Sequence, residues 1–360
     1  MKTQITRFFI ASSQEDYLLC CGDAAEVLRD LPPQSVNCCI TSPPYWNQRE
    51  YAGDSLLGHE QDIGEYVQHL REIFQQFKRV LQDDGSLWVN IGDTYKDKHL
   101  MGVPWRVAFA LQEDGWLLRN TIIWDKVKGN PCNAKDKLRN VYEYVFHFVK
   151  QKRYYYNLDV IRTPPGKPHY KDGHIVTPTG VSGKKYRQQI LRSEELNESE
   201  RQNALAALDE TLRKVESGEI PDFRMIIRGI QRSTHSDSPE YSGRAAELEK
   251  RGFCILPYHR RGTKPGDVWR IIPEDEWRRD IHCAVFPKEL CEIPIKATCP
   301  LGGVVIDPFV GTGTAVIAAL ELNRRAIGID TSQEYLEIAQ ERIEESIQHR
   351  LHSVDQLSLF

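Results

Sequence analysis

Short apolar runs and helical patterns alternate at both ends of this chain. Near the start, residues 17–21 and 36–40 predict buried strands, and residues 24–31 between them predict a short helix. From 64 to 82 the apolar residues recur three and four positions apart, which predicts an amphipathic helix leading into a strand at 86–91. This alternation is typical of βαβ units, so we predict an α/β fold with a mostly parallel sheet.

The same rhythm continues to about residue 148 and resumes near residue 268. Further helices are expected at 105–112 and 332–349, and further strands at 117–124, 141–148, 303–306 and 325–329. The strands at 117–124 and 141–148 are expected to pair antiparallel. Thr331 and Glu334 have the spacing of a capping box at the start of the last helix.

The region between these two patterned parts has a different character. It is polar, rich in Gly, Pro, Ser, Lys and Arg, and carries one clear helical stretch at 193–215. We therefore divide the chain into segments 1–162, 163–266, 267–350 and a tail at 351–360.

Composition and charge narrow the class of protein. The 360 residues are 40% hydrophobic and 27% charged, enough for one large α/β core with an inserted region. The net charge of −4 neither supports nor excludes nucleic-acid binding. The nine cysteines, which include the pairs Cys20-Cys21 and Cys38-Cys39, lack metal-ligand spacing, so we expect reduced core thiols and no metal site. No run approaches the roughly 18 apolar residues of a membrane span, and no secretion signal is evident, so a cytoplasmic protein is expected.

Cations mixed with aromatic residues in the segment 163–266 suit contacts to phosphates and base edges. Acidic residues lie among them, so a solvated, charge-balanced lobe fits this composition as well as a nucleic-acid surface does. The candidate DNA contacts are Lys184, Lys185, Arg187, Arg260 and Arg261.

A glycine-containing turn follows the expected strand at 303–306. The strand leads to Asp307, the turn contains Gly311 and Gly313, and a helix begins near Thr314. The segment lacks the third glycine of a dinucleotide fingerprint and the Gly-Lys-Ser/Thr of a phosphate loop. Asp330 ends the next strand, where a carboxylate accepts hydrogen bonds from ribose hydroxyls in other nucleoside-binding sheets, or else caps the following helix.

A second unusual segment, Thr41-Ser42-Pro43-Pro44-Tyr45, follows the expected strand at 36–40. Together the segments resemble the S-adenosylmethionine-dependent amino-group DNA methyltransferases of the permuted beta class, in which Ser/Asp-Pro-Pro-Tyr precedes the target-recognition region and Phe-x-Gly-x-Gly follows it. The resemblance covers nearly all of the chain outside the middle segment. It implies a Rossmann-like fold with a circularly permuted motif order, and 163–266 as an inserted target-recognition region.

The resemblance also implies roles for residues. It makes 1–162 the catalytic half, 267–350 the cofactor-binding half, and double-stranded DNA the substrate. The catalytic residues would be Ser42, Pro43, Pro44 and Tyr45. The residues binding S-adenosyl-L-methionine would be Asp23, His282, Phe286, Pro287, Asp307, Pro308, Phe309, Gly311, Gly313, Thr314 and Asp330. Trp46 and Trp124 are candidates for the wall of the target-base pocket.

The chemistry of Ser-Pro-Pro-Tyr supports this interpretation. An exocyclic amine on a nucleobase is a poor nucleophile because its lone pair is delocalised into the ring. The Ser42 oxygen and the Pro43 carbonyl offer two acceptors for its N–H bonds, and the two prolines stiffen the loop. Tyr45 offers a flat face for a base extruded from the duplex.

Several alternatives stay open. Ser42 favours cytosine N4 within the resembling family, whereas an Asp there is typical of adenine N6. Methyltransferases of RNA or protein share parts of the pattern, and an inactive DNA-binding module is a further alternative. The Pro131-Cys132-Asn133 segment is similar to the nucleophile loop of cytosine-C5 enzymes, but it precedes the glycine turn, so we interpret Cys132 as a loop thiol.

The last five residues resemble the peptide with which bacterial replication and repair proteins dock on the sliding clamp. They are expected to follow a short polar link after the final helix, with an apolar end and one directional hydrogen bond. This peptide is Gln356, Leu357, Ser358, Leu359 and Phe360. A companion restriction endonuclease is a second possible partner, and a tail folded onto its own domain is the alternative.

Overall fold

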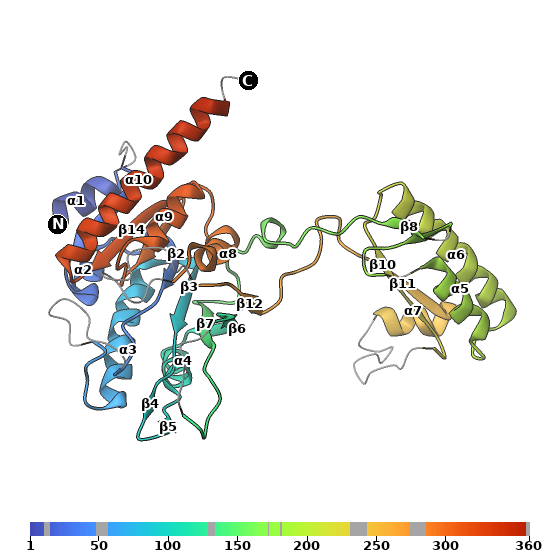
Figure 1. Cartoon of the computed structure of the whole chain (residues 1–360), viewed down its shortest axis with the longest axis horizontal. Coiled ribbons are helices and arrows are strands. Elements are labelled where there is room, and N and C mark those ends of the chain that lie inside the picture. Colours follow the sequence, from blue (N-terminus) through green and yellow to red (C-terminus); the bar gives the residue numbers. More distant parts are fainter. Residues whose placement is uncertain are drawn as a thin grey trace. The chain divides into compact units, whose positions relative to one another are not determined.

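The structure is a computed structural model that describes residues 1–10, 15–47, 57–128, 134–171, 173–180, 182–230, 243–273 and 286–357. The chain folds into two compact units. The first combines Met1–Val160 with Gly266–Phe360, and the second is Ile161–Pro265 (Figure 1).

An eight-stranded sheet forms the centre of the first unit, in the order β1-β14-β13-β2-β3-β7-β6-β12 (Figure 1). All neighbouring strands pair parallel except β7, which is antiparallel to both β3 and β6. This arrangement confirms the α/β fold class and the antiparallel pair predicted at 117–124 and 141–148. The strands are β1 (Tyr17–Cys21), β2 (Val36–Thr41), β3 (Leu81–Ile91), β6 (Leu117–Asp125), β7 (Tyr142–Val149), β12 (Val268–Arg270), β13 (Val304–Asp307) and β14 (Arg325–Asp330).

Two hydrophobic cores lie on opposite faces of this sheet, because successive side chains of a strand point to opposite sides. On β2, Cys39 packs in the core that contains α2, α3 and α4, whereas Cys38 and Ile40 pack in the core that contains α8, α9 and α10. The helices are α1 (Lys2–Phe8), α2 (Ala24–Asp30), α3 (Ile63–Val80), α4 (Val103–Glu113), α8 (Lys288–Thr298), α9 (Thr314–Glu321) and α10 (Gln333–Leu357). A small hairpin, β4 (Tyr95–Lys96) with β5 (His99–Leu100), follows β3.

The second unit has its own core. Its helices are α5 (Gly183–Arg192), α6 (Glu198–Glu216) and α7 (Gly243–Arg251), and its hairpins are β8 (His169–Lys171) with β9 (His174–Val176) and β10 (Phe223–Ile227) with β11 (Phe253–Pro257). The single helix predicted at 193–215 is wrong at its start. Asn197 and Glu200 form a capping box that begins α6, and α5 has already ended at Arg192.

Three other expectations need correction. The last helix runs to Leu357 rather than 349, because residues 350–357 contain no Gly or Pro that would end it, so no polar link precedes Gln356. Its first turn is capped by the Ser332 hydroxyl, which accepts a bond from Tyr335 N–H at 3.3 Å, and not by Thr331. Cys21 is exposed at the end of its strand, although Cys20, Cys38 and Cys39 are buried. No helix in the described part of the chain is long and apolar enough to span a membrane.

Candidate active site

The two segments predicted to share a site meet at the carboxyl edge of the sheet. Strands β2 and β13 are parallel neighbours, with Cys38 opposite Val305 and Cys39 opposite Ile306. Their ends therefore emerge side by side, and the Thr41 hydroxyl donates a hydrogen bond to Asp307 Oδ1 at 2.5 Å. This bond joins the start of the Ser-Pro-Pro-Tyr loop to the start of the glycine turn. Ligands of open α/β sheets bind at this edge.

The glycine turn is held by the neighbouring strand. Asp330 Oδ2 accepts a bond from Gly311 N–H at 2.9 Å, while Oδ1 accepts one from Ser332 N–H at 2.9 Å. Gly313 has a φ of +87°, and a Cβ there would lie 3.0 Å from the Cβ of Ala339. The turn thus needs glycine for both its conformation and its close packing. The Gly22 N–H donates a hydrogen bond to the Asp330 carbonyl at 2.9 Å, so the end of β1 lies beside the end of β14.

Asp307 is a buried carboxyl group with an incomplete set of partners. Its Oδ1 accepts bonds from Thr41 and from Phe309 N–H, but Oδ2 is buried and has no hydrogen-bond partner among the described residues. The pKa of Asp307 is raised to about 7, mainly by burial and to a smaller extent by the nearby charge of Asp330, although the two hydrogen bonds oppose the shift. Burial also raises the pKa of Asp330.

The remaining predicted cofactor residues lie mostly in the same region. Asp23 is exposed at the end of β1, where its carboxylate caps α2 through Glu26 N–H at 3.1 Å. The others are Phe286 and Pro287 before α8, Pro308 and Phe309 in the turn, and Thr314 at the start of α9. His282 lies outside the described residues, as do Pro131, Cys132 and Asn133.

The Ser-Pro-Pro-Tyr loop is anchored by bonds to two neighbouring elements. Tyr66 of α3 donates to the Pro44 carbonyl at 2.8 Å. The Tyr45 hydroxyl donates to Glu143 Oε2 at 2.6 Å and lies 3.2 Å from the Ser42 hydroxyl, which donates to it. Ser42 and Tyr45 both retain partial exposure, as a substrate contact requires.

Sequence reasoning missed two polar residues of this loop's surroundings. Asn90, near the end of β3, donates through Nδ2 to Tyr45 and to Glu143, both at 2.9 Å. Glu143, near the start of β7, also forms an ion pair with Lys126. The signal was present, because both are polar residues within mostly apolar strands, at the end that the antiparallel pairing brings to this edge.

The two tryptophans predicted to line the target-base pocket have buried side chains. Trp46 and Trp124 are only 2% and 3% exposed, and their indole N–H groups donate to the carbonyls of Glu60 and Ile271 at 2.9 and 2.8 Å. Both rings belong to the hydrophobic cores of the first unit, and their role in a base pocket stays a prediction.

The candidate DNA contacts lie in the second unit. Lys184 and Lys185 are exposed on α5, and Arg260 and Arg261 are exposed after β11. Arg187 is also exposed but forms an ion pair with Asp209. Of the terminal peptide, Gln356 and Leu357 end α10, and Ser358 to Phe360 lie outside the described residues.

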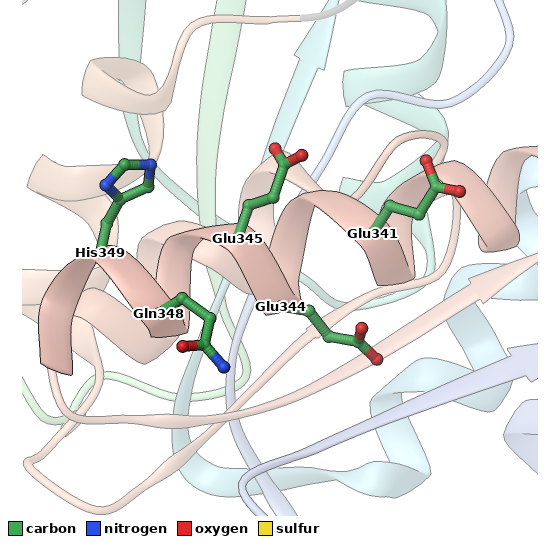
Figure 2. Close-up of a pocket in the computed structure, with 5 residues that line it drawn as sticks. All are labelled: Glu341, Glu344, Glu345, Gln348 and His349. Atoms are coloured by element: carbon green, nitrogen blue, oxygen red, sulfur yellow. The ribbon is translucent and has the colours of Figure 1, made fainter. Parts of the chain in front are cut away.

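An open hollow on α10 is a separate feature. The side chains that line this hollow project from successive turns of the helix. They are Glu341, Glu344, Glu345, Gln348 and His349 (Figure 2). It contains none of the predicted catalytic residues, and its carboxylates would repel a nucleic acid. Within the described ranges, no three His, Cys, Asp or Glu side chains are arranged to hold a metal ion.

Known proteins are similar to this chain in sequence and in fold. Type II methyltransferase M.SfiI of Streptomyces fimbriatus is 32% identical over 388 residues, covering 92% of each chain. M.SmaI of Serratia marcescens is 28% identical, covering 89% of each. The PvuII DNA methyltransferase (cytosine-N4-specific) is similar in fold, with a TM-score of 0.54 at 16% identity, covering 94% of this chain and 95% of its own.

A DNA modification methylase of Thermus thermophilus, in complex with S-adenosyl-L-methionine, has a TM-score of 0.50 at 22% identity, covering 92% of this chain and 94% of its own. The N6_N4_Mtase family, described as DNA methylase, matches residues 36–341. Because this match spans most of the chain, the protein belongs to the N6_N4_Mtase family of DNA methylases.

Proposed function

We propose that this DNA methylase transfers a methyl group from S-adenosyl-L-methionine to the N4 amino group of a cytosine extruded from duplex DNA. The observation that carries the proposal is the bond between Thr41 and Asp307. It joins the segment suited to an exocyclic amine to the segment suited to a nucleoside, so methyl donor and acceptor can meet directly.

The proposed catalytic groups are the Ser42 oxygen and the Pro43 carbonyl. Each would accept one hydrogen bond from an N–H group of the amine. This arrangement favours a pyramidal nitrogen whose lone pair is free to attack the methyl carbon. The S–CH₃ bond breaks as the N–CH₃ bond forms, so the sulfonium leaves as the neutral thioether S-adenosylhomocysteine. The positively charged amine then loses a proton to solvent water, which restores the neutral base. The Tyr45 ring would stack on the extruded base.

The edge residues fit the proposed methyl donor. Asp307 Oδ2, which has no hydrogen-bond partner among the residues that the structure describes, is a suitable neighbour for the positive charges of S-adenosylmethionine. The Asp330 carboxylate accepts backbone hydrogen bonds from Gly311, Ser332 and Thr331, and its two oxygens still keep a lone pair for a ribose hydroxyl. A resemblance in fold to a protein complexed with this compound supports the same choice.

Cytosine N4 is proposed over adenine N6 because Ser42 stands at the first position of the loop. The similarity in fold to a cytosine-N4-specific enzyme supports this choice. Measuring methyl transfer from labelled S-adenosylmethionine to duplex DNA, RNA and protein side by side tests the substrate class. A Ser42→Ala enzyme that kept full activity would remove the role of that hydroxyl.

The second unit is proposed as the target-recognition region, with its exposed cations on DNA phosphates. The relatives are type II methyltransferases, which supports a companion restriction endonuclease as a partner. The terminal peptide, residues 356–360, is proposed to bind a bacterial sliding clamp. Deleting these five residues should abolish retention on immobilised clamp, and unchanged retention would refute this partner.

A further inference from the structure

Four polar side chains are linked in series, and the first of them carries the proposed catalytic hydroxyl. The Ser42 hydroxyl donates to the Tyr45 oxygen at 3.2 Å, and the Tyr45 hydroxyl donates to Glu143 Oε2 at 2.6 Å. The other Glu143 oxygen forms the ion pair with Lys126. The Lys126 side chain is 27% exposed and that of Glu143 12%, so the pair is largely shielded from water.

The Glu143 carboxylate determines which group donates and which accepts in each hydrogen bond between these side chains. An ionised carboxylate has no proton to donate, so the Tyr45 proton must point to Glu143. The Tyr45 oxygen is then an acceptor, and the Ser42 proton points to it. Asn90 reinforces this direction, because its Nδ2 donates to both Glu143 and Tyr45, and its amide oxygen would be repelled if it faced the carboxylate.

The result at Ser42 is an oxygen whose own proton is turned away from the substrate. Asn90 Nδ2 lies 3.4 Å from that oxygen, a long and weak contact. The Ser42 lone pairs are therefore available to an approaching N–H group. With the opposite direction, the serine would present its proton to the amine and compete for the lone pair that must attack.

We infer that Glu143 is a positioning residue, whose carboxylate orients the Ser42 hydroxyl through Tyr45 as a hydrogen-bond acceptor for the target amine. The inference rests on the proposed function, since it assigns a role in the same site. Glu143 acts through other residues and does not itself touch the reacting atoms.

Glu143→Gln tests this role with little change of shape. Lys126 should hold the amide oxygen, which turns the NH₂ group toward Tyr45 and reverses the direction of these hydrogen bonds. We expect kcat for methylation of amplified, unmodified genomic DNA to fall roughly 10- to 100-fold, a range typical of residues that orient a reactive group. The dissociation constant of S-adenosylmethionine should change less than about twofold, because the cofactor segment is untouched. Glu341→Gln, the same change on exposed α10 (Figure 2), should leave both unchanged.

A double-variant cycle separates orientation from general structural support. In Tyr45→Phe the connecting hydroxyl is gone, so adding Glu143→Gln should lower kcat less than about twofold further. Losses that multiply would overturn the inference. If Glu143→Gln does not fold, Glu143→Asp keeps the charge but withdraws it by one methylene, and it should lower kcat with unchanged cofactor affinity.

The outcomes for the two proposals differ. Wild-type activity on DNA amino groups together with an unimpaired Glu143→Gln enzyme would overturn the inference alone. A wild-type protein that methylates no DNA amine would overturn the proposed function, and the role of Glu143 with it.

Discussion

Thr41 and Asp307 are 266 positions apart in the sequence, yet the hydroxyl of one donates to the buried carboxyl of the other at 2.5 Å. The bond exists because β2 and β13 are parallel neighbours whose ends emerge together. It ties the loop proposed to hold the target amine to the turn proposed to hold the methyl donor.

Replacing this hydroxyl should lower the stability of the fold. Thr41→Val keeps the shape of the side chain but removes the donor to a buried carboxyl group. We expect the free energy of unfolding at pH 8 to fall by about 2 kcal/mol, as for other bonds to charged groups. Chemical denaturation measures the loss, and Thr6→Val on exposed α1 is the control. A wild-type unfolding free energy in Thr41→Val would mean that the bond contributes nothing.

Cofactor binding should depend on pH through Asp307. Its pKa is raised to about 7 by burial, and a cationic ligand favours the ionised form. The affinity for S-adenosylmethionine should therefore rise as the pH rises through about 7, with release of a proton on binding below that pH. Calorimetry in buffers of different ionisation enthalpy measures the proton directly. Asp307→Asn should abolish the proton release, and equal release by both proteins would exclude Asp307 as its source.

His147 should make the fold sensitive to acid. Burial lowers its pKa to about 3, from an ordinary value near 6.5, and its ring is stacked 4.0 Å from that of Trp88. The unfolded chain binds this proton more readily, so the stability that His147 contributes above pH 6.5 is lost as the pH falls toward 3. Lowering the pH from 7.5 to 5 should therefore reduce the unfolding free energy of the wild type more than that of His147→Phe. His99→Phe, at an exposed position, is the control variant.

Gly92 should be essential for the position of Tyr45. A Cβ on Gly92 would lie 2.7 Å from the Tyr45 ring and 3.5 Å from Glu143 Cγ, so Gly92→Ala must displace the ring. We expect kcat to fall about 100-fold, the scale set by a misplacement of about 1 Å, with unchanged cofactor affinity. Gly266→Ala, where a Cβ meets nothing within 4 Å, is the control. Full activity of Gly92→Ala would show that the ring position is not critical.

DNA binding should depend on the exposed lysines of α5. If Lys184 and Lys185 contact phosphates, replacing both with Gln should reduce the slope of log affinity against log salt by about two. Lys214 forms an ion pair with Glu210 on α6, so Lys214→Gln should leave the slope nearly unchanged. Titration of a fluorescent DNA duplex at four salt concentrations measures it, and an unaltered slope in the double variant would place the contacts elsewhere.

Much of the first unit could be predicted from local pattern. The ends of two apolar strands placed Thr41 and Asp307 at one sheet edge, because parallel strands emerge in the same direction. Their direct bond could not be predicted, since it depends on β2 and β13 being adjacent, and strand order depends on long-range packing. Glu143 is visible in the sequence as a polar residue in a mostly apolar strand, but its bond to Tyr45 could not be predicted, because Tyr45 lies on a loop 98 positions earlier.

Other features were missed for different reasons. Trp46 and Trp124 are satisfied by carbonyls of residues far along the chain or in an irregular loop, which no periodicity reports. The capping-box spacing of Asn197 and Glu200 indicates the break between α5 and α6, but the helical periodicity on both sides favours one continuous helix.

The identity of the modified base tests the account most directly. Duplex DNA treated with the purified protein and S-adenosylmethionine should be digested to nucleosides and measured by mass spectrometry. We predict N4-methylcytosine in the digest, and none when the Ser42→Ala protein is used. A digest containing only N6-methyladenine would contradict it.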